Sequence, residues 1–132
     1  MIVVDASVLA NAVGDDERAG RDARDLLRAH RDLAAPDLVD VETTAVLRRR
    51  WLAGTVTDER FEQAVDDLVD LPLRRFPTLG LMHRAFELRA DITAYDACYV
   101  ALAEALDWPL CTADRRLADA PGPRCEIQLI TM

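Results

Sequence analysis

The stretch "ITAYDACYVALAEALDWPLCTAD" (residues 92–114) joins a helix pattern to a strand pattern, and this junction decides the fold class. Residues 92–106 have the small apolar composition of a helix that packs inside a protein, and "PLCTAD" (109–114) is an apolar run of strand length. Two similar strand patterns, "MIVVD" (1–5) and "LAAP" (33–36), lie earlier, and a helical pattern follows each. Strands that alternate with helices predict an α/β fold with a parallel sheet.

The remaining segments extend this alternation along the chain. Further strand patterns at "PLRRF" (72–76) and "CEIQLIT" (125–131) predict a sheet of about four to five strands with helices on both faces. No repeat or linker divides the 132 residues, so we expect one domain over residues 1–132. The other helical patterns are "SVLANAV" (7–13), "RAGRDARDLLRAH" (18–30), "DLVDVETTAVLRRRWLAG" (37–54), "TDERFEQAVDDLVDL" (57–71) and "TLGLMHRAFELR" (78–89).

Composition limits the chemistry that the chain can perform. The 24 acidic residues outnumber the 16 basic ones, all of them Arg, and the net charge of −8 argues against a general coat for nucleic acid. The 3 Cys and 2 His residues show no metal-ligand spacing, so hydrolytic chemistry would rest on carboxylates. No apolar run approaches the roughly 20 residues that cross a bilayer, so we expect a soluble cytoplasmic protein with no membrane partner.

Two aspartates directly follow strand patterns. Asp5 ends "MIVVD" and Asp114 ends "LCTAD". In open parallel sheets, ligands bind at the carboxyl ends of the strands, which is where both acids are expected. Each one alone is better explained as a helix N-cap or turn residue, a role worth about 1 kcal/mol.

Glu42 lies on a predicted helix in a place that is unusual for an acid. On a helical wheel it falls within an apolar stripe that includes Leu38 and Val41, while Thr43 falls outside that stripe. A glutamate at the rim of the core that pairs with Arg49 explains this position as well as a functional role does.

Asp96 is the one acid in the first half of the apolar helix pattern with which we began. Thr93 and Asp96 fit a capping box, in which the hydroxyl bonds the backbone three residues on. Asp96 also shares a helix face with Tyr99 and Val100, so its carboxylate points along an otherwise apolar surface. Capping and ligand binding are compatible roles for this residue.

Together the four acids suggest a shared site at one edge of the sheet. At an effective dielectric near 20, two carboxylates ~4 Å apart repel by about 4 kcal/mol, so an unneutralised cluster would become protonated or splay apart. A divalent cation removes this repulsion, and carboxylate oxygens suit Mg²⁺ or Mn²⁺.

The order of these motifs resembles the PIN domains, and most closely the VapC-type toxins of bacterial toxin–antitoxin pairs. "IVVDASVL" is similar to the first motif of the family, "PDLVDVETTAVLRR" to the second, and "ITAYDACYVALAEALDWPLCTADRRL" to the third and fourth. The resemblance covers essentially the whole chain. It places the acids Asp5, Glu42, Asp96 and Asp114 and the accompanying hydroxyls Ser7 and Thr112.

The resemblance implies a metal-dependent endoribonuclease. In this interpretation the four acids hold Mg²⁺ or Mn²⁺, which activates water for attack on the phosphodiester of a cellular RNA such as transfer or ribosomal RNA. The implied partners are a VapB-type antitoxin and a second copy of the chain in a homodimer. Asp119 is a candidate for an additional ligand, although an exposed acid near a helix end explains it better.

Substrate contact and an alternative function complete the predictions. Arg115 and Arg116 directly follow Asp114 and are the preferred candidates for RNA contact, although such pairs usually only solvate a surface or pair with nearby acids. The alternative function is a catalytically silent PIN-like module that binds RNA or protein. The presence of all four acids argues against it.

Overall fold

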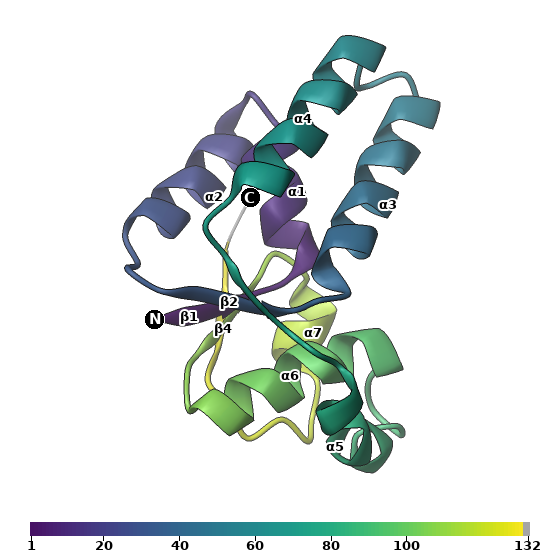
Figure 1. The fold of residues 1–132 in the computed structure, drawn as a ribbon. Coiled ribbons are helices and arrows are strands. Elements are labelled where there is room, and N and C mark those ends of the chain that lie inside the picture. The colour runs from purple at the N-terminus through teal and green to yellow at the C-terminus, as the bar shows by residue number, and fades with distance from the viewer. Residues whose placement is uncertain (131–132) are drawn as a thin grey trace.

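The computed structural model describes residues 1–130 and has the predicted α/β architecture, with the sheet at its centre (Figure 1). Within these residues, five parallel strands pair in the order β3-β2-β1-β4-β5. The strands are β1 (Ile2–Val4), β2 (Leu33–Pro36), β3 (Arg74–Phe76), β4 (Leu110–Thr112) and β5 (Ile127–Leu129). The predicted last strand ran to Thr131, which lies outside the described residues together with Met132.

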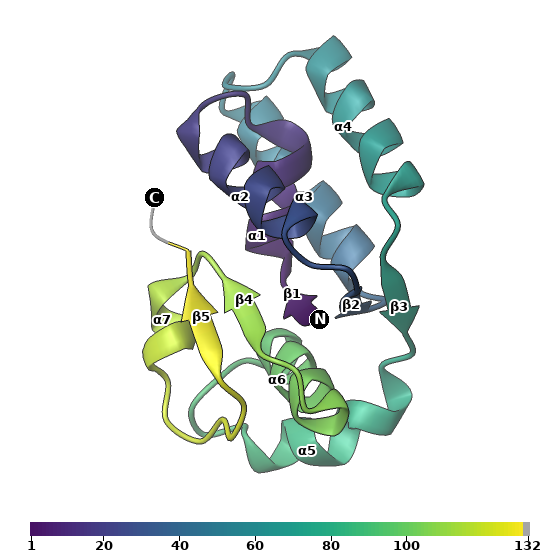
Figure 2. The ribbon, with the colours of Figure 1, turned by 90° about the vertical axis from the view of Figure 1, so that its left-hand side faces the viewer.

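Helices cover both faces of the sheet, as predicted. Figure 1 shows α1 to α4 on one side of the strands and α5 and α6 on the other, and Figure 2 shows the same two layers from the side. The helices are α1 (Ala6–Gly14), α2 (Arg18–Arg28), α3 (Val39–Leu52), α4 (Asp58–Asp70), α5 (Met82–Glu87), α6 (Ala94–Leu106) and α7 (Arg115–Asp119), and a 3₁₀ turn spans Leu79–Leu81. None of the helices in the described part of the chain has the length and apolar character to cross a membrane.

Local signals in the sequence explain where several helices begin and end. The Thr57 hydroxyl accepts a hydrogen bond of 3.1 Å from the Arg60 amide and caps α4. The Thr93 hydroxyl does the same for α6 through the Asp96 amide, also at 3.1 Å. Gly54 follows α3 with a φ of +81°, a left-handed conformation that favours glycine.

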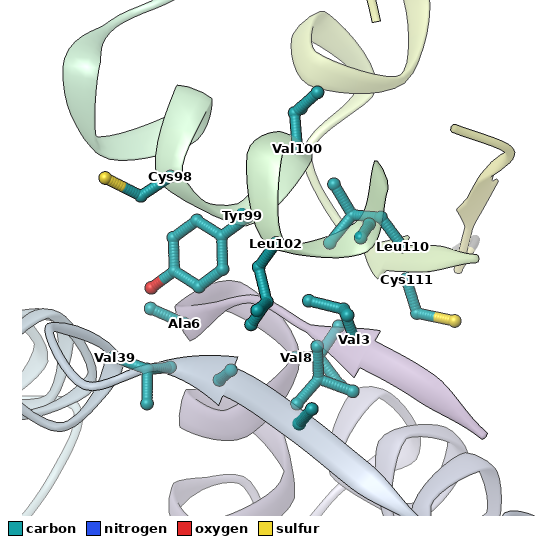
Figure 3. Packing of buried hydrophobic residues seen from close by; sticks show 14 of the residues in the cluster. Val3, Ala6, Val8, Val39, Cys98, Tyr99, Val100, Leu102, Leu110 and Cys111 are labelled. Atoms are coloured by element: carbon teal, nitrogen blue, oxygen red, sulfur yellow. The ribbon is translucent and has the colours of Figure 1, made fainter. Parts of the chain in front are cut away.

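The core lies on both faces of the central strands. Val3 in β1 is fully buried, and α6 packs against β1, β2 and β4. Figure 3 shows the resulting cluster, in which Leu102 and Tyr99 of α6 lie near Val8 of α1 and Val39 of α3. This packing fixes α6 and the starts of α1 and α3 around one end of β1.

The structure corrects the wheel assignment for α3. Val41, which was expected on the apolar stripe, is 74% exposed, and Thr43, which was expected off it, is fully buried. The buried positions of α3 are Val39, Thr43 and Leu47, at helical spacing of four. Apolar residues are spread around this helix, so its pattern does not single out a face, and packing against α1 and α4 decides it.

The strand order creates a natural place for a site. The chain runs outward from β1 to β2 and β3 on one side, and β4 and β5 lie on the other, so the order reverses between β1 and β4. In open parallel sheets, the carboxyl ends of the strands at such a reversal form a crevice that binds ligands. Asp5 follows β1, and Asp114 follows β4.

Candidate active site

Asp5 is the most deeply buried acid of this edge, with 5% of its surface exposed. Its Oδ1 accepts hydrogen bonds from the Ser7 hydroxyl at 2.6 Å and from the Val8 amide at 3.2 Å. Its Oδ2 accepts one from the Thr112 hydroxyl at 2.5 Å. Asp5 therefore caps α1, as one reading of the sequence predicted. Of the two hydroxyls that the family motifs place, Ser7 holds Asp5 from α1 and Thr112 ties it to β4.

The same two hydroxyls shape the loop after β4. The Ser7 hydroxyl accepts a hydrogen bond from the Ala113 amide at 2.9 Å, and the Thr112 hydroxyl accepts one from the Asp114 amide at 3.0 Å. Asp114 itself caps α7 by accepting a bond of 2.9 Å from the Arg116 amide. Asp5 and Asp114 are thus joined through one network of backbone and hydroxyl groups.

The other two acids come from helices on opposite faces of the sheet. Glu42 lies in the first turn of α3, and its Oε1 accepts a hydrogen bond of 2.7 Å from the Tyr99 hydroxyl. Asp96 lies in the first turn of α6, one turn before Tyr99, and its amide donates to Thr93. The hydroxyl half of the predicted capping box is confirmed.

These acids meet in one cleft of about 410 Å³ beside the ends of β1 and β4. The cleft is lined by Asp5, Ala6, Ser7, Asn11, Glu42, Val46, Arg49, Arg50, Asp96, Tyr99, Ala113 and Asp114. All four predicted acids are among its lining residues. The caps account for several of these acids one at a time, but they do not account for their convergence.

A second cleft of about 460 Å³ shares Asp96 and Asp114 with the first. Arg116, one of the predicted RNA contacts, lines this second cleft, whereas Arg115 is exposed and lines neither. Asp119 is exposed at the end of α7 and also lines neither cleft, which agrees with the reading of it as a surface acid.

The pKa values of Asp5 and Asp96 are raised, as expected for acids that are buried close to other acids. Burial raises the pKa of Asp5 to about 6, although its bonds from Ser7 and Thr112 act against this, and nearby Asp96 adds to it. Burial also raises the pKa of Asp96, and the neighbouring carboxylate of Asp114 raises it further. The folded chain therefore holds these carboxylates at a cost in free energy.

Glu42 and Tyr99 form a coupled pair at the wall of the cleft. Burial raises the pKa of Glu42, as does Asp96, while Tyr99 and Arg49 act in the opposite direction. Burial and the Glu42 carboxylate raise the pKa of Tyr99 well above its usual range, so the phenol keeps its proton and is the donor of this bond.

The donor set fits a hydrated divalent cation better than an all-protein cage. Within residues 1–130, no group of three or more His, Cys, Asp or Glu side chains is arranged so that it could hold a metal ion by itself. Neighbouring carboxylates repel each other, which favours binding of a cation between them. Hydroxyl groups hold two of these carboxylates in place, those of Asp5 and Glu42. Mg²⁺ typically keeps several waters and binds through one or two carboxylates, which this cleft can offer.

Several lining residues were not predicted as part of the site. Tyr99 could have been found, because it lies three residues after Asp96 and so on the same helix face. Arg49 and Arg50 belong to a run of three arginines (residues 48–50), whereas the preferred candidates for RNA contact were Arg115 and Arg116. Arg50 donates to Asn11 Oδ1 at 2.7 Å and to the Ala10 carbonyl at 3.3 Å, a contact between α3 and α1 that no local pattern reveals.

Comparison with known proteins agrees with this geometry. A family model of the PIN domain matches residues 2–123, so the chain belongs to the PIN domain family. Ribonuclease VapC9 of Mycobacterium tuberculosis is 42% identical over 130 residues, which cover 98% of each chain. Ribonuclease VapC1 of the same organism is 41% identical over 129 residues, covering 97% of this chain and 96% of the relative. The predicted resemblance to VapC proteins is confirmed.

Solved structures share the fold at much lower identity. VapC20 of Mycobacterium tuberculosis, described as a toxin that cleaves the sarcin-ricin loop, aligns over 83% of this chain and 87% of its own, with a TM-score of 0.66 and 18% identity. VapBC2 from Rickettsia felis aligns over 99% of this chain and 100% of its own, with a TM-score of 0.68 and 16% identity. At these identities the likeness supports the fold alone.

Proposed function

We propose that this protein is a divalent-metal-dependent endoribonuclease and the toxin of a VapBC-type toxin–antitoxin pair. One observation carries the proposal: four carboxylates from four separate segments line a single cleft at the strand-order reversal of a PIN domain. The relatives at 41–42% identity are named VapC ribonucleases, which supports RNA as the substrate.

In this proposal Asp5, Glu42, Asp96 and Asp114 form the site for Mg²⁺ or Mn²⁺, some of them as direct ligands and the others through water molecules bound to the cation. The cation supplies charge neutralisation at the phosphate and a bound water of lowered pKa. Asp5 keeps one orientation because hydroxyl and amide donors occupy both of its oxygens. The raised pKa values of Asp5, Glu42 and Asp96 fit this role, since a cation would relieve the repulsion that helps to raise them.

The arginines around the acids supply the attraction that an acidic edge lacks. Arg49 and Arg50 line the first cleft, and Arg116 lines the second, on the far side of Asp96 and Asp114. An RNA strand that runs through both clefts would meet Arg side chains on either side of the carboxylates. Guanidinium groups pair well with phosphate oxygens, so we assign them the positioning of the backbone.

The partner in this proposal is a VapB-type antitoxin. Structural neighbours include VapBC2 from Rickettsia felis and a toxin–antitoxin complex from Klebsiella pneumoniae, which supports this class of partner. A basic antitoxin side chain in the acidic cleft would compete with the cation, since an Arg fork pairs well with carboxylates. The homodimer stays a prediction, which light scattering of the purified chain would test.

RNA cleavage by the purified protein tests the proposal against the silent binding module. We expect cleavage of total cellular RNA with Mn²⁺ or Mg²⁺, none with EDTA, and none by the Asp5→Asn variant. Cleavage that persists in EDTA or in Asp5→Asn would contradict the mechanism. RNA that is bound but left intact under all metal conditions would favour the binding module. Sequencing the fragments would identify the RNA and the position of the cut.

A further inference from the structure

Tyr99 is the largest of the fully buried side chains, and it carries a polar group. Only 1% of its surface is exposed, and its ring belongs to the cluster that Val39 and Leu102 help to form (Figure 3). A phenylalanine would fill the same volume without a hydroxyl that needs a partner. The position therefore calls for an explanation beyond packing.

The partner of the Tyr99 hydroxyl is a cleft acid on another element. The hydroxyl of Tyr99 in α6 donates to Glu42 Oε1 in α3 across 2.7 Å, between residues 57 positions apart in the chain. Asp96 precedes Tyr99 by one turn on α6, so a single helix carries both a cleft acid and the donor to a second one. The packing of α6 against the sheet therefore sets the relative positions of two of the four acids.

We propose that Tyr99 is a positioning residue that orients the Glu42 carboxylate for the divalent cation. The inference rests on the proposed function, because it gives Glu42 a cation to bind. A hydrogen bond to one oxygen of a carboxylate ligand limits its rotation and lowers the entropy lost when the cation binds. Groups that orient metal ligands in this way typically change metal affinity or activity by about 10–100-fold when they are removed.

Tyr99→Phe tests this role, because it removes the hydroxyl and keeps the ring in the core. We expect the dissociation constant for Mn²⁺, measured by calorimetry without RNA, to rise about 10-fold or more. The Mn²⁺ concentration that gives half-maximal RNA cleavage should rise by a similar factor, with kcat at saturating Mn²⁺ changed less than about threefold. A defect of packing alone would lower the melting temperature without moving the metal dependence.

Tyr95→Phe is the matched control, because Tyr95 stands on the same helix and is 63% exposed. The same chemical change there should leave the Mn²⁺ dissociation constant within about twofold of the wild-type value, as expected for an exposed hydroxyl. An equal rise in both variants would contradict a specific role for Tyr99.

Glu42→Asp approaches the same bond from its other end, since the shorter side chain keeps the charge but withdraws from Tyr99. We expect weaker Mn²⁺ binding in Glu42→Asp and a further change of less than about twofold when Tyr99→Phe is added, because coupled residues are not additive. Unchanged Mn²⁺ binding in Tyr99→Phe, or in Glu42→Asp if the first variant does not fold, would overturn the role of Tyr99. A wild-type chain that binds no Mn²⁺ would overturn the proposed function itself.

Discussion

Helix α6 carries one acid near each end, and their surroundings differ. Glu104, near the carboxyl end, accepts two bonds from Arg84, at 2.7 and 3.1 Å, and one from the Arg124 amide at 2.7 Å. Burial alone would raise the pKa of Glu104, but the bonds from Arg84 and the Arg124 amide, together with the charges of both arginines, outweigh it and lower the pKa. The positive charge that pairs with Glu104 is therefore the guanidinium group of Arg84 in the same chain.

Asp96, near the amino end, faces other acids instead. Burial raises the pKa of Asp96, and Asp114 raises it further. Arg116 lowers this pKa only weakly, and its side chain is 94% exposed. The comparison teaches that the chain pairs Glu104 closely with an arginine inside the fold, whereas Asp114 in the cleft has only a looser ion pair of 3.7 Å with the exposed Arg116. Among the described residues, Asp96 has no ion pair. In the proposed function, a divalent cation from solution binds to the acids at the amino end of α6.

The largest difference between the two acids should appear in activity. Asp96→Asn removes a proposed ligand, and we expect kcat/KM for RNA cleavage to fall about 100-fold or more, since metal catalysis is worth several kcal/mol. Glu104→Gln should stay within about threefold of wild type, because its contacts lie at the other end of the helix. If kcat/KM fell as much in Glu104→Gln as in Asp96→Asn, the two acids would not differ in their importance for cleavage.

The pH dependence of stability should differ in sign between the two regions. Asp5, which shares the cleft with Asp96, has its pKa raised from 3.8 to about 6, so the folded chain binds this proton more tightly than the unfolded chain. Without metal, Asp5 should therefore cost stability as the pH rises from about 4 to 6, by about 3 kcal/mol at most. Glu104, with a lowered pKa, stabilises at neutral pH, and this contribution is lost as the pH falls.

Denaturant unfolding in EDTA at several pH values measures these contributions. Asp5→Asn should flatten the loss of stability between pH 4 and 6, and Glu104→Gln should flatten the loss at lower pH. The relevant quantity is the slope of the free energy of unfolding against pH, because either substitution can also raise or lower this free energy at every pH. An unchanged slope in Asp5→Asn would show that this carboxyl does not titrate in the expected window.

At neutral pH without metal, the two variants of α6 should change stability in opposite directions. Glu104→Gln leaves Arg84, whose side chain is 19% exposed, with the longer contact to Glu87 at 3.7 Å in place of its close pair with Glu104, and we expect a loss of about 1–2 kcal/mol. Asp96→Asn removes a repulsive charge, so its melting temperature should be no lower than that of wild type, and higher if repulsion dominates. A clear fall in Asp96→Asn would assign this residue mainly to capping.

The smallest effect concerns the arginines beyond Asp114. Replacing Arg115 and Arg116 with Ala should weaken binding of RNA to an inactive Asp96→Asn background by about twofold to tenfold. The dependence of binding on salt should also become flatter, since each lost phosphate contact lowers the slope by about one. Of these two arginines, Arg116 lines a cleft and Arg115 does not, so Arg116→Ala alone should give most of the effect. If the variant without Arg115 and Arg116 bound RNA as tightly as its Asp96→Asn parent at every salt concentration, these two arginines would not contact phosphate. Arg49 and Arg50 would then be the remaining candidates.

Short-range patterns predicted the framework of the site well. Asp5 and Asp114 could be placed because each ends an apolar strand pattern, and parallel strands end at one edge of a sheet. Asp96 could be placed because Thr93 marks the start of its helix. The family resemblance joined these positions to Glu42 and to the two hydroxyls.

What the sequence did not reveal depends on contacts between distant segments. The buried face of α3 could not be identified, because Val41 and Thr43 have side chains that fit either environment and the neighbouring helices decide. The bond from Tyr99 to Glu42 and the contact of Arg50 with α1 join residues far apart in the chain. Such pairings follow from the three-dimensional packing and from no local spacing.

A calorimetric titration with Mn²⁺ at pH 7, in the absence of RNA, tests the central claim most directly. Wild type and Glu104→Gln should bind Mn²⁺ with dissociation constants within about twofold of each other, while Asp96→Asn should bind at least about 10-fold more weakly. The same Mn²⁺ concentration should also raise the melting temperature of the first two proteins more than that of Asp96→Asn. Equal Mn²⁺ binding by all three proteins would contradict the claim that the cleft acids form a cation site.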